Sequence, residues 1–578
     1  MNPTGRNIAF DVIKGIAIIA VVLYHFGVCD SCYLGVDVFL VIAGYMTAKS
    51  LWKSADKSIR SGAGWLKDRL IRMLPLLLIA ELILLLYGLL LMMPDDYENL
   101  AQSVVASNVF ANNILAEMTI KSYWNVANAY RPLMHTWFLG VLMQAYIIFV
   151  VCDIIIGRFR GKRPGAYIAF WAILSAISLF LYLSGGNHGS KYYLIQYRIF
   201  EFGIGSLVFY LQAKFGMKTD GALGGAAIIV AYAGLLIMLF TNLIDLKMRY
   251  MVVLADILTA VLAYLLPLSA FSCNRVFFNK PLAIIGSASF SIYIWYQIVT
   301  AVGRYSFTDD FKFWQCILII LIIGVLAWLS YRYVEKARIG RKGIIMLGSM
   351  FVLINIGALT VYARAGVFYD IPELEVTKGN AQTHMWAAYC DSAYQFEKPF
   401  NENGKPKWMV VGNSFGRDFV NIIRESYIAD SVNISYAYDY YSDEYADRIH
   451  CADIVFVANS GSEEFVNGIK TLMRDGARIV IAGEKNFGEC NGQVFRNRNK
   501  RDYLQSTIAM RPGYDERNEE FKRIYKDDFI DLIGMVKQPD GRVRVFTDDG
   551  LFISQDCLHL TRAGARFYAR RINWNLFY

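Results

Sequence analysis

Long apolar segments recur between residues 8 and 363 of the chain. Eleven of them can each supply the ~20 residues that a helix needs to cross about 30 Å of hydrocarbon. Two of the eleven, 193–212 and 281–303, also contain polar residues. The pattern predicts a polytopic α-helical membrane domain with about 11 transmembrane helices. The predicted spans are 8–28, 33–52, 70–93, 135–156, 166–184, 193–212, 222–242, 249–271, 281–303, 314–334 and 343–363.

From about residue 371 onward, short apolar runs alternate with amphipathic helical patterns. The runs "KWMVVGN", "VNISYAYD", "ADIVFVANS", "ARIVIAGE" and "RVRVFTDD" have strand length, whereas "EEFVNGIKTLMRDG" and "RAGARFYARRI" have helical spacing. This alternation predicts a mostly parallel sheet with helices on both faces. We therefore divide the chain into a membrane domain at 1–340, a further transmembrane helix and linker at 341–370, and an α/β domain at 371–578.

Composition agrees with the membrane assignment. Hydrophobic residues make up 56% of the 578 residues and charged residues only 19%, with a mean hydropathy of +0.34, which excludes an ordinary soluble protein. The first apolar segment lacks a small-residue cleavage site, so we expect no removable signal peptide.

The net charge of +9 does not indicate nucleic-acid binding, because many Lys and Arg residues lie in short connections between apolar segments. The connections after the second, fourth, eighth and tenth spans are basic, and those after the first, third, fifth and ninth are not. The positive-inside rule then predicts a cytoplasmic N-terminus. An odd number of spans places the α/β domain on the outer side of the membrane.

Cys29 and Cys32 form a C-x-x-C near the end of the first span. There is no second C-x-x-C or His pair nearby, so the pattern favours a disulfide or free thiols over a zinc site. We expect no metal.

A candidate nucleophile lies in "KWMVVGNSFGRDF", where a strand pattern runs through a tight turn into a helix and places Ser414 at the turn. In "DCLH" near the C-terminus, one short loop can bring both Asp556 and His559 to this serine. Asp556 would fix the tautomer of His559, which would take the proton of Ser414. Asn459 is either an oxyanion donor or a plain loop residue. The structural alternative is that Ser414 caps a helix and His559 is a surface residue.

In the first span, Lys14 and His25 are eleven positions apart. On a helix they fall about 20° apart on one face and roughly 16 Å apart in depth. His25 can act as a base toward a hydroxyl or thiol. Alternatively, His25 forms a hydrogen bond at the interface and Lys14 extends its charge to the membrane surface.

Other ionisable residues lie in or beside the spans, where they are costly and therefore default to functional hypotheses. Arg69 and Arg72 lie one helical turn apart and either grip the phosphates of a nucleotide cofactor or set topology. Arg198 and Glu201 belong to such a site or form a buried ion pair. The remaining candidates are Asp37 in the second span and His135 at the start of the fourth.

Seven motifs in order make the membrane part resemble the membrane acyltransferase-3 family over roughly residues 5–340. They are "DVIKGIAIIAVVLYH", "YLGVDVFLVIAGY", "RLIRMLP", "HTWFLG", "YRIFEFGIGSL", "FSIYIWY" and "SYRYVE". The Gly-Asn-Ser and Asp-x-x-His blocks make the last domain similar to the SGNH hydrolase family, which has a three-layer, flavodoxin-like α/β fold. The chain thus resembles the acyltransferase-3 variant with a fused SGNH domain.

The resemblance implies an O-acyltransferase, usually an O-acetyltransferase, of a bacterial cell-surface glycan such as lipopolysaccharide O-antigen, capsule, exopolysaccharide or peptidoglycan. Acetyl-CoA would be the cytoplasmic donor, and the family's Arg/Lys-x(10)-His motif falls on Lys14 and His25. His25 would be the base in the membrane and Ser414 would transfer the acyl group outside. Tyr296 stands where the family often has histidine. The residues implied in acyl transfer or donor binding within the membrane domain are Lys14, Asp37, Arg69, Arg72, His135, Arg198 and Glu201.

The implied location is the bacterial inner membrane, with the last domain periplasmic or otherwise extracytoplasmic, and with the bilayer and the glycan as partners. Two other classes stay open. A membrane-tethered carbohydrate esterase would remove acyl groups with the same serine, and a transporter would line a pathway with the intramembrane charges. Dependence on acyl-CoA distinguishes the transferase from the esterase, and a pure transporter should survive loss of Ser414.

Overall fold

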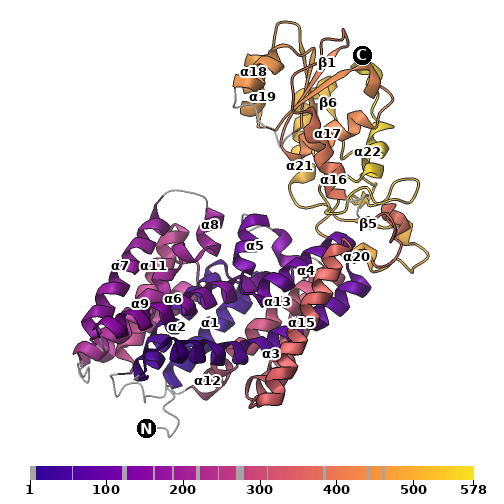
Figure 1. The fold of residues 1–578 in the computed structure, drawn as a ribbon. Coiled ribbons are helices and arrows are strands. Elements are labelled where there is room, and N and C mark those ends of the chain that lie inside the picture. The colour runs from indigo at the N-terminus through magenta and orange to yellow at the C-terminus, as the bar shows by residue number, and fades with distance from the viewer. Residues whose placement is uncertain are drawn as a thin grey trace. The chain divides into compact units, whose positions relative to one another are not determined.

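The chain divides into two compact units, each described here by itself (Figure 1). Unit 1 comprises Met1–Gly88, Asn99–Arg304 and Asp310–Thr360, and unit 2 comprises Leu89–Glu98, Tyr305–Asp309 and Val361–Tyr578. The helix expected within 341–370 is therefore grouped mainly with unit 1. This computed structural model describes residues 8–577 except 55, 120–125, 161–162, 185–187, 216–221, 245, 268–278, 309, 382–385, 439–442 and 459–461.

Unit 1 is helical, and some of its helices extend a few residues into the ranges of unit 2. The helices are α1 (Ile8–His25), α2 (Gly35–Lys53), α3 (Ile59–Leu91), α4 (Pro94–Asn108), α5 (Asn112–Thr119), α6 (Trp137–Arg160), α7 (Pro164–Leu183), α8 (His188–Tyr193), α9 (Ile199–Phe215), α10 (Ala222–Phe240), α11 (Met248–Leu265), α12 (Lys280–Ser287), α13 (Ser289–Ser306), α14 (Phe313–Ser330) and α15 (Arg341–Ala363).

Nine helices in the described ranges are long and apolar enough to cross a membrane, and all nine coincide with predicted spans. The other two predicted spans are the ones that contain polar residues. The span 281–303 is a broken element, in which α12 and α13 meet at 70°. The span 193–212 is not one continuous helix, because its main helix, α9, begins only at Ile199 and has 17 residues. The prediction of about eleven spans is therefore confirmed only as nine or ten.

Helices α2 and α9 pack with their backbones in close approach. A Cβ at Gly44 would overlap the carbonyl oxygen of Phe202, and a Cβ at Gly205 would overlap that of Val41. Only glycine fits at these two positions, as is common where helices associate in a membrane. The close pairing fixes α9, and with it the buried polar residues at its start.

Unit 2 contains a five-stranded parallel sheet in the order β2-β1-β3-β4-β6. This is the flavodoxin-like order of a doubly wound sheet, and the predicted parallel sheet with helices is confirmed. The elements of the sheet are β1 (Lys407–Val411), β2 (Asn433–Ala437), β3 (Ile454–Val457), β4 (Arg478–Ala482) and β6 (Phe529–Ile530). The α-helices around it in the described residues are α16 (Trp386–Asp391), α17 (Ser414–Arg424), α18 (Asp443–His450), α19 (Glu463–Leu472), α20 (Gly492–Phe495), α21 (Tyr514–Tyr525) and α22 (Arg562–Ala569).

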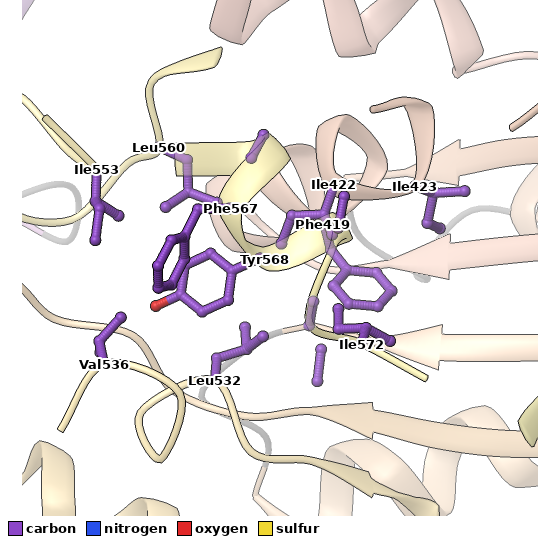
Figure 2. Close-up of a cluster of buried hydrophobic side chains, with 14 of the residues drawn as sticks. Phe419, Ile422, Ile423, Leu532, Val536, Ile553, Leu560, Phe567, Tyr568 and Ile572 are labelled. Atoms are coloured by element: carbon purple, nitrogen blue, oxygen red, sulfur yellow. The ribbon is translucent and has the colours of Figure 1, made fainter. Parts of the chain in front are cut away.

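Alternate side chains of the central strands supply two cores. Trp408 and Val410 of β1 belong to the core under α17 and α22, whereas Met409 and Val411 belong to the core under α18 and α19. Figure 2 shows part of the first core, where side chains of α17, α22 and the loops before and after α22 converge. This packing joins the helix that begins at Ser414 to the helix that follows the DCLH loop.

One predicted strand is wrong. Within "RVRVFTDD", only Val543–Arg544 form a strand, β7, which pairs antiparallel with β5 (Thr507–Ile508) outside the main sheet. The fifth strand of the main sheet is β6, a two-residue strand beside the end of β4. A strand this short has no alternation of its own that a sequence pattern can detect.

Candidate active sites

Ser414 is the first residue of α17, directly after β1. Gly412 holds φ at +157°, and a Cβ there would overlap the carbonyl oxygen of Ala458, so the turn can pass the end of β3 only with glycine. The Asn413 side chain caps the helix by accepting the N–H of Phe415 at 3.0 Å. The serine therefore lies at the carboxyl end of the sheet, beside β1, the strand at which the strand order reverses direction. Doubly wound folds bind ligands at this point.

A hydrogen-bonded chain links the three predicted residues. The Ser414 hydroxyl lies 2.8 Å from Nε2 of His559, and Nδ1 of His559 lies 2.6 Å from Oδ2 of Asp556. The other carboxylate oxygen of Asp556 accepts the backbone N–H groups of Leu558 and His559 at 3.0 and 2.7 Å. With Nδ1 donating to the carboxylate, Nε2 is an acceptor for the serine proton, which is the arrangement of an activated nucleophile.

The same contacts control the charge of Asp556. Burial by itself would raise the pKa of this carboxyl, but hydrogen bonds from the His559 side chain and from the two backbone N–H groups lower the pKa below its ordinary value. The carboxylate is thus kept ionised, so it can orient the imidazole and stabilise the imidazolium that forms during catalysis.

A buried ion pair holds the backbone on both sides of His559. Oδ2 of Asp418 lies 2.6 Å from Nζ of Lys485 and accepts the N–H of Leu560 at 3.1 Å. Nζ of Lys485 also donates to the carbonyl oxygen of Leu558. Asp418 is on α17, one turn after Ser414, and Lys485 follows β4, so the pair ties both elements to the catalytic loop. Sequence reasoning missed both residues.

The oxyanion donor is not assigned from the described residues, because Asn459 lies outside them. The N-terminus of α17 presents backbone N–H groups near Ser414, which is the kind of donor that stabilises a developing oxyanion. One of them, the N–H of Phe415, is donated to Asn413.

Unit 1 contains a cavity of about 450 Å³ between α1, α2, α3, α6 and α13. Arg69 stacks on Trp65 at 4.5 Å, and Arg72 forms an ion pair with Glu335 at 2.8 Å. Apolar and aromatic side chains such as Phe39 and Tyr146 supply the rest of the wall. The five cations that line the cavity are Lys14, Lys49, Lys53, Arg69 and Arg72. Lys49 and Lys53 were not predicted, although their four-residue spacing on α2 was a usable signal.

Aromatic rings connect this cavity to His25. Tyr293 lines the cavity, its hydroxyl donates to the carbonyl oxygen of His135, and its ring centroid lies 5.0 Å from that of His135. The His135 ring is 5.6 Å from Tyr296, whose hydroxyl lies 3.3 Å from Nε2 of His25. The structure therefore brings Lys14, His25 and His135 into one continuous region, and Tyr296 joins the two histidines.

Asp37, Arg198 and Glu201 lie apart from the residues that line this cavity. Arg198 forms ion pairs with Asp37 at 2.6 Å and with Glu201 at 3.1 Å, and all three side chains are fully buried. This geometry is the one described by the second interpretation of Arg198 and Glu201, a buried ion pair between helices. A further carboxylate, Asp256 of α11, is buried in the same surroundings.

The C-x-x-C cysteines carry free thiols. Both donate toward the carbonyl oxygen of Leu239, from Cys29 at 3.4 Å and from Cys32 at 2.9 Å. In the parts of the chain that the structure describes, no group of three or more His, Cys, Asp or Glu side chains is arranged to hold a metal ion.

The chain is similar in sequence to known proteins over its membrane part. The chain is 26% identical over 359 residues to a candidate O-acetyltransferase of Staphylococcus aureus, covering 56% of each protein. It is 28% identical over 340 residues to a candidate membrane-bound transacylase of Komagataeibacter xylinus, covering 58% of this chain and 83% of the relative. It is 25% identical over 347 residues to the peptidoglycan O-acetyltransferase of Listeria monocytogenes, covering 57% and 55%.

The chain spans about half the length of the first of these relatives. No solved structure matches it significantly. The family model described as an acyltransferase domain matches residues 7–333, which are more than half of the 578 residues. The matched region includes the cationic cavity, His25 and His135, and the chain belongs to the acyltransferase-3 family.

Proposed function

We propose that this protein is an O-acetyltransferase that moves an acetyl group from cytoplasmic acetyl-CoA across the bacterial inner membrane to hydroxyl groups of a cell-surface glycan. The acceptor would be a lipopolysaccharide O-antigen, a capsule or exopolysaccharide, or peptidoglycan. The observation that carries the proposal is the hydrogen-bonded Ser414–His559–Asp556 chain in a protein whose membrane part belongs to the acyltransferase-3 family. The names of the relatives, which include a peptidoglycan O-acetyltransferase, support the acetyl group and the glycan class.

The cationic cavity supports an acyl-CoA donor. Coenzyme A carries several phosphate charges and a long, mostly uncharged arm that ends at the reactive sulfur. Lys49, Lys53 and Arg69 can neutralise phosphates, whereas Lys14 and Arg72 already form ion pairs with Asp11 and Glu335. Aromatic side chains can cover the arm. The rings of Tyr293, His135 and Tyr296 continue from the cavity to His25. His25 would accept the proton of the group that attacks the thioester.

The outer domain, which we take to be an SGNH-like domain outside the membrane, would complete the transfer in two steps. In the first, Oγ of Ser414 attacks the carbonyl of the acyl group delivered by the membrane part while His559 accepts the serine proton. The bond between the acyl carbon and the oxygen or sulfur atom that carried it breaks, and His559 passes the proton to that atom. This gives an acetyl ester on Ser414. In the second, a glycan hydroxyl attacks that ester, His559 accepts the hydroxyl proton and returns it to Oγ, and the acetylated glycan leaves.

The same triad can catalyse hydrolysis if water replaces the glycan, which is the esterase alternative. The esterase has no use for a cavity lined by five cations in the membrane part, and that cavity therefore favours the transferase. Acetyl-CoA dependence separates the two.

The proposal can be tested with the purified full chain in proteoliposomes that contain no glycan. Acetyl-CoA labelled in the acetyl group is added, the reaction is quenched in acid, and label on the protein is counted. We expect up to one hydroxylamine-labile acetyl group per chain, lost in both Ser414→Ala and His25→Ala. Ser431→Ala, at the end of a short turn in the same domain, is the matched control and should label like the wild type. Equal labelling of Ser414→Ala, or no labelling of the wild type, would contradict the proposal.

A further inference from the structure

A second cavity lies in unit 2, on the same side of the sheet as the catalytic loop. Its volume is about 380 Å³, within the range of small-molecule sites. The wall comes from the loop around Glu373–Glu375, from α16, from the ends of α17 and α22, and from Gln555. The proposed function does not use any of these side chains.

The cavity adjoins the triad through two residues. Trp386 lines it, and the ring centroid of Trp386 lies 6.3 Å from that of His559, while its indole N–H donates to the carbonyl oxygen of Leu560 at 3.0 Å. Gln555, which also lines the cavity, immediately precedes Asp556. The cavity is therefore one residue away from the triad on each count: Trp386 lies between it and the imidazole of His559, and Gln555 is bonded to Asp556.

One lining atom is an acceptor that lacks a donor. Oε1 of Gln555 is buried and has no hydrogen-bond partner among the described residues. A buried polar atom without a partner is costly, and a bound donor removes that cost. A hydroxyl group is a suitable donor, because it is neutral and can approach a carbonyl oxygen directly.

The aromatic side chains of the cavity suit a sugar ring. Trp386 and Tyr389 are three residues apart on α16 and both line the cavity, with Arg562 stacked over the Tyr389 ring at 5.1 Å. A sugar ring has an apolar C–H face and a rim of hydroxyl groups. Flat rings can cover the C–H face, while polar groups such as Gln555 and Ser392 can bind the hydroxyls.

The charges around the cavity are balanced. Arg562 and Arg566 both form ion pairs with Glu425, at 3.3 and 2.8 Å. The third lining cation, Arg424, is offset by the lining carboxylates at 373 and 375. With three cations and three carboxylates at the site, the cavity does not select for an anionic ligand.

We propose that this cavity is the acceptor subsite and that it binds a neutral mono- or disaccharide segment of the glycan, with the reacting hydroxyl directed toward His559. The role of acceptor subsite rests on the proposed function, whereas the binding of a sugar does not depend on acyl transfer. Trp386 covers the sugar face, and Oε1 of Gln555 accepts a hydrogen bond from a sugar hydroxyl.

Binding can be measured by isothermal titration of the full chain in nanodiscs with two probes, the neutral N,N′-diacetylchitobiose and the acidic digalacturonic acid. We expect the wild type and Ser414→Ala to bind the neutral disaccharide with the same affinity. Gln555→Leu and Trp386→Ala should each weaken that binding by about tenfold, because each removes a direct contact. The acidic probe should bind at least about tenfold more weakly than the neutral one.

Gln505→Leu is the matched control, since Gln505 is exposed on a short turn away from the lining, and it should bind like the wild type. Three results would overturn the proposal: unchanged binding in Gln555→Leu and Trp386→Ala, preference for the acidic probe, or no binding of either probe. Because Ser414→Ala is expected to bind, a chain that binds sugar but transfers no acetyl group would refute the proposed function and leave the subsite standing.

Discussion

Asp556 is the residue on which the state of the catalytic imidazole depends. Its carboxylate accepts the ring N–H of His559 and two backbone N–H groups, and these contacts lower its pKa below the ordinary value. Aspartate ordinarily titrates near pH 4. A carboxyl whose pKa is lowered stays ionised at and above that pH, and it takes up a proton only as the pH falls through the lowered pKa.

Asp556→Asn should therefore lower the rate of p-nitrophenyl acetate hydrolysis by about 10³–10⁴-fold, since the amide favours the wrong tautomer of His559. The loss should be present throughout pH 5 to pH 8, because Asp556 is ionised over this whole interval. Rates measured across the interval check this. A variant that hydrolyses the ester at the wild-type rate anywhere in this interval would contradict the role assigned to Asp556.

Among the elements, α17 and the segment after β4 hold the catalytic loop. Asp418 and Lys485 bind the backbone at Leu560 and Leu558, and the N–H of Phe487 donates to the carbonyl oxygen of Cys557 at 2.9 Å. Cys557 has a φ of +68°, which a non-glycine residue adopts only when its surroundings impose it. These contacts impose it, and they make Asp418 and Lys485 positioning residues for His559.

Asp418→Ala should destabilise unit 2 by about 3–5 kcal/mol and slow ester hydrolysis, because it leaves Lys485 buried without its anion. The double variant Asp418→Leu, Lys485→Met should be less destabilised than Asp418→Ala, since no buried charge is left alone. Thermal unfolding of the full chains measures the order of stability of the variants, and ester hydrolysis rates show whether the catalytic loop keeps its position. Asp528→Asn, which breaks the exposed pair with Arg478, is the control and should change stability by no more than about 1 kcal/mol. A double variant as unstable as Asp418→Ala would contradict this account.

The elements that sequence could predict are those whose signal is local. Nine spans were found because a helix exposed to lipid must be continuously apolar. The break between α12 and α13 and the short α9 were missed, because these elements meet protein as well as lipid and can carry polar residues such as Glu201.

The same distinction applies to the sites. Ser414, Asp556 and His559 were accessible to sequence reasoning because a strand–turn–helix and an Asp-x-x-His loop are local patterns. Lys485 and Gln555 were not, because their significance depends on contacts that only the folded chain makes: Lys485 with Asp418, and Gln555 with a cavity built from four separate segments.

For the whole molecule, we propose donor chemistry in unit 1 and acceptor chemistry in unit 2. Unit 1 has the cationic cavity and the ring series that ends at His25, and unit 2 has the triad and the cavity beside it. If the acetyl group must pass through both, the two sites act in series, and loss of either stops the product. An esterase domain acting on the product would instead oppose the membrane domain.

The most direct measurement is the O-acetyl content of surface glycans in cells that carry the wild type, Ser414→Ala or His25→Ala at matched protein levels. We predict that both variants lose the ester to the level of cells without the protein. An increase in Ser414→Ala would show that unit 2 removes acetyl groups. Loss in His25→Ala alone would show that the membrane domain completes the transfer without the serine, and either result would contradict a relay through both sites.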